Sequence, residues 1–148
     1  MKKWLFLGIV LVFGCEDNSN CGISDFSEDV VIRFMNIETK AARTVTFDEM
    51  RVAYSNRDVI AYVDDDEGTI YSFPVDLAAE STSFEFLTDS VNYDFTLTYR
   101  RDVFIENPDC GPINRIFNLD GTSIEFDSIA FQVPELTKFV SPHVEIYF

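Results

Sequence analysis

The sequence has 148 residues, of which 11 are Lys or Arg and 26 are Asp or Glu, so its formal net charge at pH 7 is −15. This length supports one domain with its own hydrophobic core, and the negative charge argues against a nucleic-acid partner because it repels phosphate backbones. Aromatic residues make up 15% of the chain, which argues against disorder because so much apolar surface can offset the entropy of ordering.

The first 14 residues have the pattern of a secretory signal peptide. Lys2 and Lys3 supply its positive charge, and residues 4–14 are uncharged and mostly apolar. As a helix, residues 4–14 would span about 16 Å, whereas the hydrocarbon core of a bilayer is roughly 30 Å thick. The segment is therefore predicted to be a targeting signal and not a membrane anchor.

The stretch Val12-Phe13-Gly14-Cys15 resembles a lipobox, the signal for acylating a bacterial lipoprotein on the cysteine thiol and cutting the chain just before it. The small Gly14 fits this signal, whereas Phe13 is bulkier than the residue usual at its position. The alternative is an ordinary signal peptide that leaves Cys15 as a free thiol. We predict lipidation at Cys15, and two or more acyl chains would anchor the protein stably, since each buried methylene contributes about 0.8 kcal/mol.

Residues 15–28 are predicted to form a polar tether, because they are rich in Asn, Ser, Asp and Glu and lack periodicity. Glu16 and Asp17 resemble the acidic export signal of surface-exposed Bacteroidota lipoproteins, and a merely solvated tether explains them equally well. Removal of the signal peptide leaves 9 basic against 26 acidic residues, a net charge of −17. The expected location is the bacterial cell envelope, lipid-anchored at the outer membrane, with the side of that membrane left open.

The remaining cysteines form an even pair. With Cys15 assigned to acylation, Cys21 and Cys110 lie in a compartment that permits disulfides. A bond between them would close a loop of about 90 residues, worth roughly 4 to 5 kcal/mol on a chain-entropy estimate. The alternative is two free thiols. The predicted disulfide would join the tether to the far end of the domain.

Residues 29–148 are predicted to be a single all-β domain, because apolar and polar residues alternate there with a period of two. Many short strands with hardly any helical pattern indicate an immunoglobulin-like antiparallel β-sandwich of about seven to nine strands. The expected strands lie at residues 30–35, 44–54, 59–63, 69–77, 83–87, 93–99, 116–117, 124–126 and 143–148.

The alternation that starts in residues 93–99 predicts an inward-facing arginine. In residues 93–99 the odd-numbered side chains are expected to face the core. Val103 and Ile105 keep that parity, which would aim Arg101 inward as well. Either a bulge absorbs Arg100 and Arg101, or the guanidinium group meets a carboxylate at the edge of the sandwich.

A tight turn is predicted at Asp120-Gly121. Glycine accepts the positive φ that a two-residue hairpin demands, and Asp-Gly is a favoured sequence for such a turn. The hairpin would join residues 116–117 to residues 124–126.

Three stretches of the body carry a family resemblance. They are VVIRF at residues 30–34, LTYRRDVFIENPDCG at residues 97–111 and HVEIYF at residues 143–148. With the lipobox and a second cysteine soon after it, the chain resembles a family of small uncharacterised Bacteroidota envelope lipoproteins that carry a domain of unknown function. In that family a tether cysteine and a Cys-Gly step recur, here Cys21 and Cys110, while Pro112 departs from the bulky residue expected. The resemblance implies an envelope location, supports the disulfide and implies no reaction.

Candidate catalytic groups are sparse. His143 is the only histidine and is expected on the outer side of the last strand, while Val144, Ile146 and Phe148 face inward. No nucleophile elbow accompanies it, the 26 acidic residues single out no glycosidase pair, and too few His and Cys remain for a zinc site. We therefore predict no enzyme activity, no catalytic residue and no cofactor.

A weak calcium candidate lies in the acidic run before Gly68. Asp64, Asp65 and Asp66 offer hard oxygen ligands, yet no register starting at Asp64 gives the spacing of an EF-hand loop. A solvated hairpin tip explains the run better, so no metal site is predicted.

The predicted function is that of a cell-envelope lipoprotein whose domain is a non-catalytic binding or assembly module. Its partners would be the membrane, through acyl chains on Cys15, and an envelope protein or a glycan. Such a module predicts an exposed patch of Tyr, Phe or Met on one sheet or edge strand. The alternative is a carbohydrate- or small-ligand-binding module, which predicts a groove lined by aromatic residues, carboxylates and amides.

Overall fold

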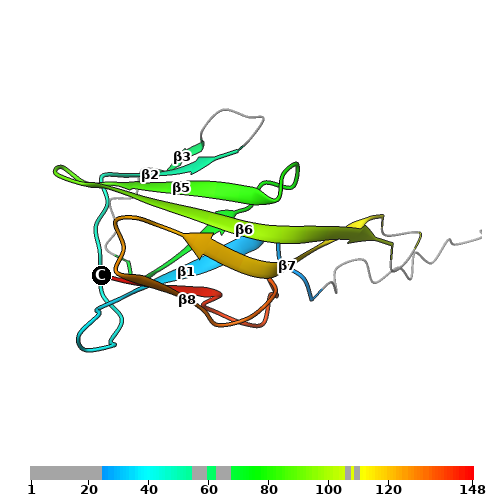
Figure 1. Ribbon diagram of the computed structural model, residues 1–148. Helices are drawn as coiled ribbons and strands as arrows, with labels where there is room; N and C mark the ends of the chain where they lie inside the picture. Colours follow the sequence, from blue (N-terminus) through cyan, green and yellow to red (C-terminus); the bar gives the residue numbers. More distant parts are fainter. Residues whose placement is uncertain (1–24, 55–59, 63–67, 106–107, 109–110) are drawn as a thin grey trace, which may run out of the picture.

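The computed structural model describes residues 25–54, 60–62, 68–105, 108 and 111–148, which contain nine strands and no helix (Figure 1). The strands are β1 (Asp29–Met35), β2 (Glu49–Ala53), β3 (Ile60–Tyr62), β4 (Ile70–Pro74), β5 (Ser81–Leu87), β6 (Asn92–Phe104), β7 (Ile113–Thr122), β8 (Ser128–Phe131) and β9 (Val144–Tyr147).

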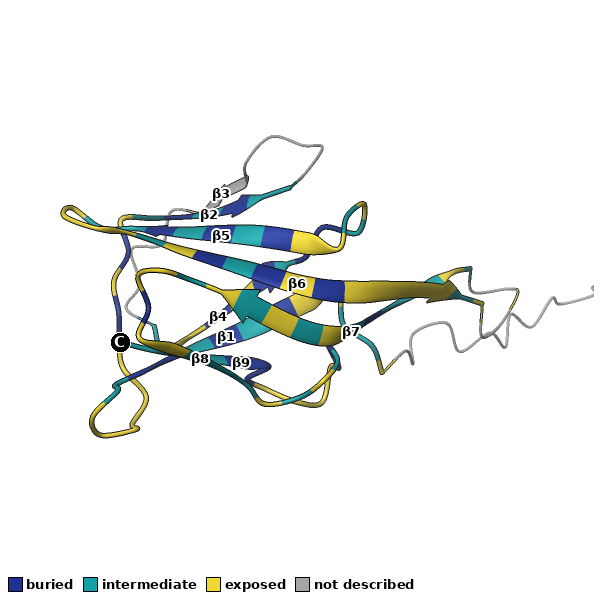
Figure 2. Ribbon diagram, in the orientation of Figure 1, coloured by how far each residue is buried: buried dark blue, intermediate teal, exposed yellow. Residues whose placement is uncertain are grey.

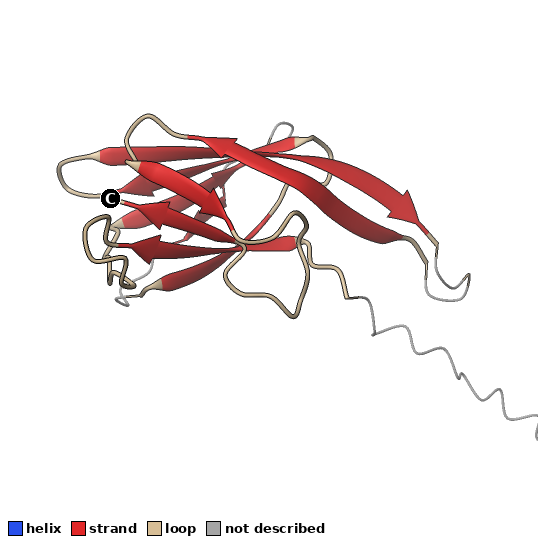
Figure 3. Ribbon diagram, turned by 60° about the horizontal axis from the view of Figure 1, so that its bottom comes forward, coloured by secondary structure: helices blue, strands red, loops and turns tan. Residues whose placement is uncertain are grey.

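The strands form two sheets that pack as separate layers (Figure 3). One has the order β4-β1-β9-β8 and the other the order β3-β2-β5-β6-β7. All neighbouring strands are antiparallel except β1 and β9, which pair in parallel with Ile32 opposite Val144. The predicted all-β sandwich and its number of strands are confirmed.

The core lies between the sheets and is built from every second residue of the strands (Figure 2). Val30, Ile32 and Phe34 of β1 are fully buried, as the alternation predicted. Phe34 is the centre of an aromatic cluster, with ring centroids 5.2 to 6.2 Å from those of Phe47, Tyr71, Phe86, Phe126 and Phe148. Tilted and edge-to-face pairs of this kind add about 0.5 to 1.5 kcal/mol each beyond the burial of area.

The predicted hairpin at Asp120-Gly121 is wrong, because β7 runs straight through this dipeptide. Gly121 lies opposite Leu97 of β6, and a Cβ atom there would come within 2.6 Å of Cε2 of Phe95 and 3.0 Å of the Thr96 carbonyl oxygen. The glycine therefore makes room for a core ring in a strand, not for a turn. The chain bends later, through residues 124–127, before β8 begins.

Beyond Tyr99, β6 and β7 continue past the end of the facing sheet as a two-stranded projection (Figure 1). We call residues 100–105 and 113–115 the arm. Its start is marked by a bulge, because Thr98 pairs with Asp120 while Arg100 pairs with Phe117, which leaves one extra residue in β7. Asn118, inside that bulge, has a φ of 53°.

Arg101 fits neither of the two predicted arrangements. The extra residue of the bulge belongs to β7 and not to β6, so Arg100 and Arg101 both stay in the regular alternation of β6. Both arginines and Val103 are nevertheless exposed, and the far end of β6 is accordingly yellow in Figure 2. The expectation that Val103 and Ile105 face the core is wrong, because the strand outruns the opposite sheet.

Candidate functional site

A groove opens at the end of the sandwich from which the arm projects. Three segments build it: the start of β1, the residue that follows β2, and the loop between β4 and β5. We call it the end groove; its volume is about 410 Å³, and its lining residues are Glu28, Asp29, Tyr54, Pro74, Val75, Asp76, Leu77 and Ala78. Antiparallel pairing brings two of these segments together, because Asp29 of β1 lies opposite Pro74 of β4.

A buried ring of hydrogen bonds fixes the backbone of Asp76, one of the residues that line the end groove. The Asp76 amide donates to Thr82 Oγ1 at 2.7 Å, and the Tyr99 hydroxyl donates to the Asp76 carbonyl at 2.6 Å. The Thr82 hydroxyl lies 2.8 Å from the Tyr99 hydroxyl and donates to it, which closes the ring. Burial raises the pKa of Tyr99, so the phenol stays protonated as a donor. The backbone of this lining residue is therefore held before any ligand arrives.

The end groove has an acidic and aromatic lining. Glu28, Asp29 and Asp76 contribute carboxylates, and no Lys or Arg is among its lining residues. Glu28 Oε1 accepts a hydrogen bond of 2.7 Å from Asn114 of the arm, and Asp76 Oδ1 accepts one of 2.8 Å from the Ala78 amide. Such a site can accept hydrogen bonds from ligand hydroxyl or ammonium groups.

Tyr54 supplies the aromatic side chain of the end groove. It is half-buried, and its hydroxyl donates a hydrogen bond of 3.5 Å to the Pro74 carbonyl. Aromatic faces and a few placed polar groups are the usual components of a small-ligand site. Chemically, the arrangement suits a polar ligand with one apolar face.

The prediction that His143 faces outward is wrong, because its side chain is only 1% exposed. Its Nδ1 accepts a hydrogen bond of 2.9 Å from the Val31 amide, and its Nε2 lies 2.8 Å from the Thr137 carbonyl and donates to it. Burial lowers the pKa of His143. The histidine precedes β9, so the strand alternation does not govern it. It is a neutral structural link between β1 and the loop before β9.

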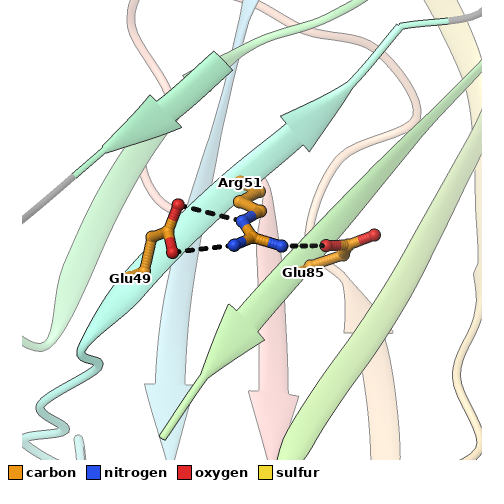
Figure 4. Close-up of polar contacts among 3 residues, drawn as sticks. All are labelled: Glu49, Arg51 and Glu85. Atoms are coloured by element: carbon orange, nitrogen blue, oxygen red, sulfur yellow. Dashed lines mark hydrogen bonds and ion pairs between the residues drawn. The ribbon is translucent and has the colours of Figure 1, made fainter. Parts of the chain in front are cut away.

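The outer face of the five-stranded sheet does not present the expected aromatic or methionine patch between β2 and β5. Glu49, Arg51 and Glu85 form an ion-pair cluster there (Figure 4). Arg51 donates from Nε and Nη2 to the two oxygens of Glu49 at 2.9 Å each, and its Nη1 lies 3.6 Å from Glu85. The hydrogen bond from Arg51 lowers the pKa of Glu49. These side chains form ion pairs with one another, so the cluster lies on the surface of the sheet and is not a candidate ligand site.

Several predicted site residues lie outside the described residues. They are Cys15, Cys21, Cys110, Asp64, Asp65 and Asp66, so lipidation, the disulfide and the weak calcium candidate remain predictions. Within the described ranges, no group of three or more His, Cys, Asp or Glu side chains is placed to hold a metal ion. The same part of the chain contains no helix of the length and apolar character needed to cross a bilayer.

The sequence did not identify the end groove as a site. Its lining comes from three segments without a shared motif, and only the folded sheets bring Glu28, Tyr54 and Asp76 together. A groove with aromatic and acidic lining was expected of the ligand-binding alternative, but no residue could be assigned to it. Comparison with family models, curated proteins and solved structures finds no match to the chain.

Proposed function

We propose that the chain is a cell-envelope lipoprotein, held at the outer membrane by acyl chains on Cys15, whose sandwich is a non-catalytic binding or assembly module. The lipobox-like residues 12–15 and the preceding signal pattern support the anchor. The resemblance of three stretches to Bacteroidota lipoproteins supports the same location, with Cys21 and Cys110 joined.

The end groove is the observation that carries the binding role. Its lining residue Asp76 is fixed by hydrogen bonds with Thr82 and Tyr99, and preorganised sites lose less entropy when they bind. Two of its three carboxylates, Glu28 and Asp76, already accept hydrogen bonds from protein groups. This supports a role in holding a ligand rather than in transferring its protons.

A second candidate function is carbohydrate binding. Tyr54 offers a ring against which the apolar face of a sugar can pack, and Glu28 and Asp29 lie in the same groove to accept hydrogen bonds from sugar hydroxyls. This observation favours a neutral glycan over an anionic ligand, since the lining carries negative charge only.

Co-purification of the intact lipoprotein from detergent-solubilised envelopes tests the proposal, with a glycan array as the second assay. The informative variant is Tyr54→Ala, and the matched control is Tyr147→Ala, a half-buried tyrosine on β9. A stoichiometric protein retained by the wild type and the control but lost by Tyr54→Ala is the expected result for an assembly module. Array signal with the same dependence on Tyr54 would favour the glycan.

Two outcomes would contradict the proposal. A partner or glycan bound equally well by Tyr54→Ala would place binding outside the end groove. Turnover of a bound glycan by the wild type would contradict the non-catalytic role.

A further inference from the structure

Exposed apolar side chains gather at the end of the domain where the described chain begins. Val103 and Ile105 of the arm are 53% and 63% exposed, and Phe139 and Val140 of the loop before β9 are 79% and 37% exposed. Isolated exposed apolar residues need no explanation, but four at one end form a candidate contact surface. We call these four residues the apolar end.

Residues 25 and 26 connect the two halves of the apolar end. The ring of Phe26 meets that of Phe104 edge-on, with centroids 5.7 Å apart. Phe26 also forms a β-bridge with Thr137, and the Lys138 amide donates to the Asp25 carbonyl at 2.9 Å. The arm and the loop therefore flank the point where the chain enters the domain.

The chain before residue 25 limits how far this end can lie from a membrane. Ten residue steps separate Asp25 from Cys15, which span at most about 33 to 36 Å when fully extended. A lipid on Cys15 would thus keep the apolar end within this distance of the bilayer surface.

We infer that the apolar end rests in the bilayer interface, so that Val103, Ile105, Phe139 and Val140 contact lipid. This inference rests on the lipid anchor of the proposed function. The apolar side chains would leave water for the boundary between headgroups and acyl chains, as those of interfacial segments do. Contact would orient the domain and hold the end groove near the membrane.

The apolar end is flanked by charges of both signs, and the mature chain as a whole has a net charge of −17, which fits zwitterionic better than anionic lipid. Arg100, Arg101 and Lys138 are close in sequence to the apolar residues, but so are Asp25 and Asp102. Long basic side chains can reach phosphate groups while their stems stay in apolar surroundings. Because both signs are present, the contact is expected to form on phosphatidylcholine vesicles and to persist at high salt.

A tryptophan reporter tests the contact on the full lipidated protein. The only tryptophan of the sequence, Trp4, lies in the predicted signal peptide, so Phe139→Trp gives a mature chain with one indole. The control is Ile124→Trp, at a 94% exposed position that follows β7 at the opposite end. Each protein is reconstituted into dioleoylphosphatidylcholine vesicles that contain brominated phosphatidylcholine, and the vesicles are floated.

The expected result is that both proteins float, and that only the Phe139→Trp reporter shows blue-shifted emission, quenching by brominated lipid and loss of quenching by iodide. Adding Val103→Ser and Ile105→Ser should restore iodide quenching in part. A floating protein whose Phe139→Trp reporter stays open to iodide would overturn the contact but leave the anchor standing. Protection from iodide without quenching by brominated lipid would also overturn it, because protein would then cover the residue. Failure to float would overturn the anchor and this inference together.

Discussion

The Tyr99 hydroxyl donates a hydrogen bond of 2.6 Å to the Asp76 carbonyl, which ties a lining residue of the end groove to strand β6. The change Tyr99→Phe would leave the Asp76 carbonyl and the Thr82 hydroxyl without this partner in a buried place. We expect it to lower the free energy of unfolding by about 1 to 3 kcal/mol, the cost of buried unsatisfied polar groups. Urea denaturation measures this.

The matched control is Tyr93→Phe. Tyr93 is half-buried on the same strand, and its ring stacks on Phe126, a contact that phenylalanine keeps. We expect this control to change stability by less than about 0.5 kcal/mol. Equal effects of the two substitutions would mean that the ring of hydrogen bonds does not hold Asp76 in place.

The free energy of unfolding should depend on pH because His143 binds a proton more readily in the unfolded state. An unfolded histidine takes up a proton as the pH falls through about 6.5, whereas burial keeps His143 neutral to a lower pH in the folded protein. The unfolded state then binds more protons, so the free energy of unfolding falls as the pH drops below about 6.5, by at most about 1.4 kcal/mol per pH unit.

The variant His143→Gln isolates this effect, because the chain has no other histidine. We expect lower stability than wild type at pH 8, since the bonds to Val31 and Thr137 are disturbed, but a flatter profile between about pH 7 and 5.5, above the range of ordinary carboxylates. Denaturation midpoints across that range give the comparison. An unchanged slope in the variant would show that His143 is not buried in its neutral form.

Gly121 should tolerate no side chain, although its neighbours in β7 do. The added Cβ of Gly121→Ala would press on the ring of Phe95 and the backbone of Thr96, and overpacking of this kind costs about 1 to 3 kcal/mol. Thr122→Ser, at the exposed next position, should cost less than about 0.5 kcal/mol. Thermal unfolding of both variants decides the point, and a neutral Gly121→Ala would show that Phe95 and Thr96 leave room for a Cβ atom at this position.

Phe34 is expected to be the most costly aromatic residue to truncate, because its ring meets five others. Phe34→Ala should lower the free energy of unfolding by about 3 to 5 kcal/mol. Phe139→Ala, at a 79% exposed position, should lie within about 0.5 kcal/mol of wild type in the absence of lipid. Guanidinium titrations of both variants measure the difference; a small loss for Phe34→Ala would contradict the central place of this ring.

The sequence predicted the sandwich because alternation is imposed directly by burial of one sheet face. Val30, Ile32 and Phe34 are buried where the period of two placed them. The same rule failed at Val103, since alternation says which side of a strand a residue is on but not whether another sheet covers that side. It failed at His143 because the strand begins one residue later, at Val144.

Local turn signals were weaker evidence than packing. Asp-Gly favours a hairpin in isolation, but at Gly121 the closeness of the Phe95 ring requires glycine in a continuous strand. The end groove could not be predicted for a related reason: Glu28, Tyr54 and Asp76 are far apart in sequence, and only strand pairing together with the packing of the two sheets brings them to one place.

Mass spectrometry of the amino terminus of the native protein tests the proposed anchor most directly. We predict a chain that begins at Cys15 and carries acyl groups, recovered from the detergent-soluble envelope fraction. A free thiol at Cys15 on a protein found in the aqueous extract would contradict it.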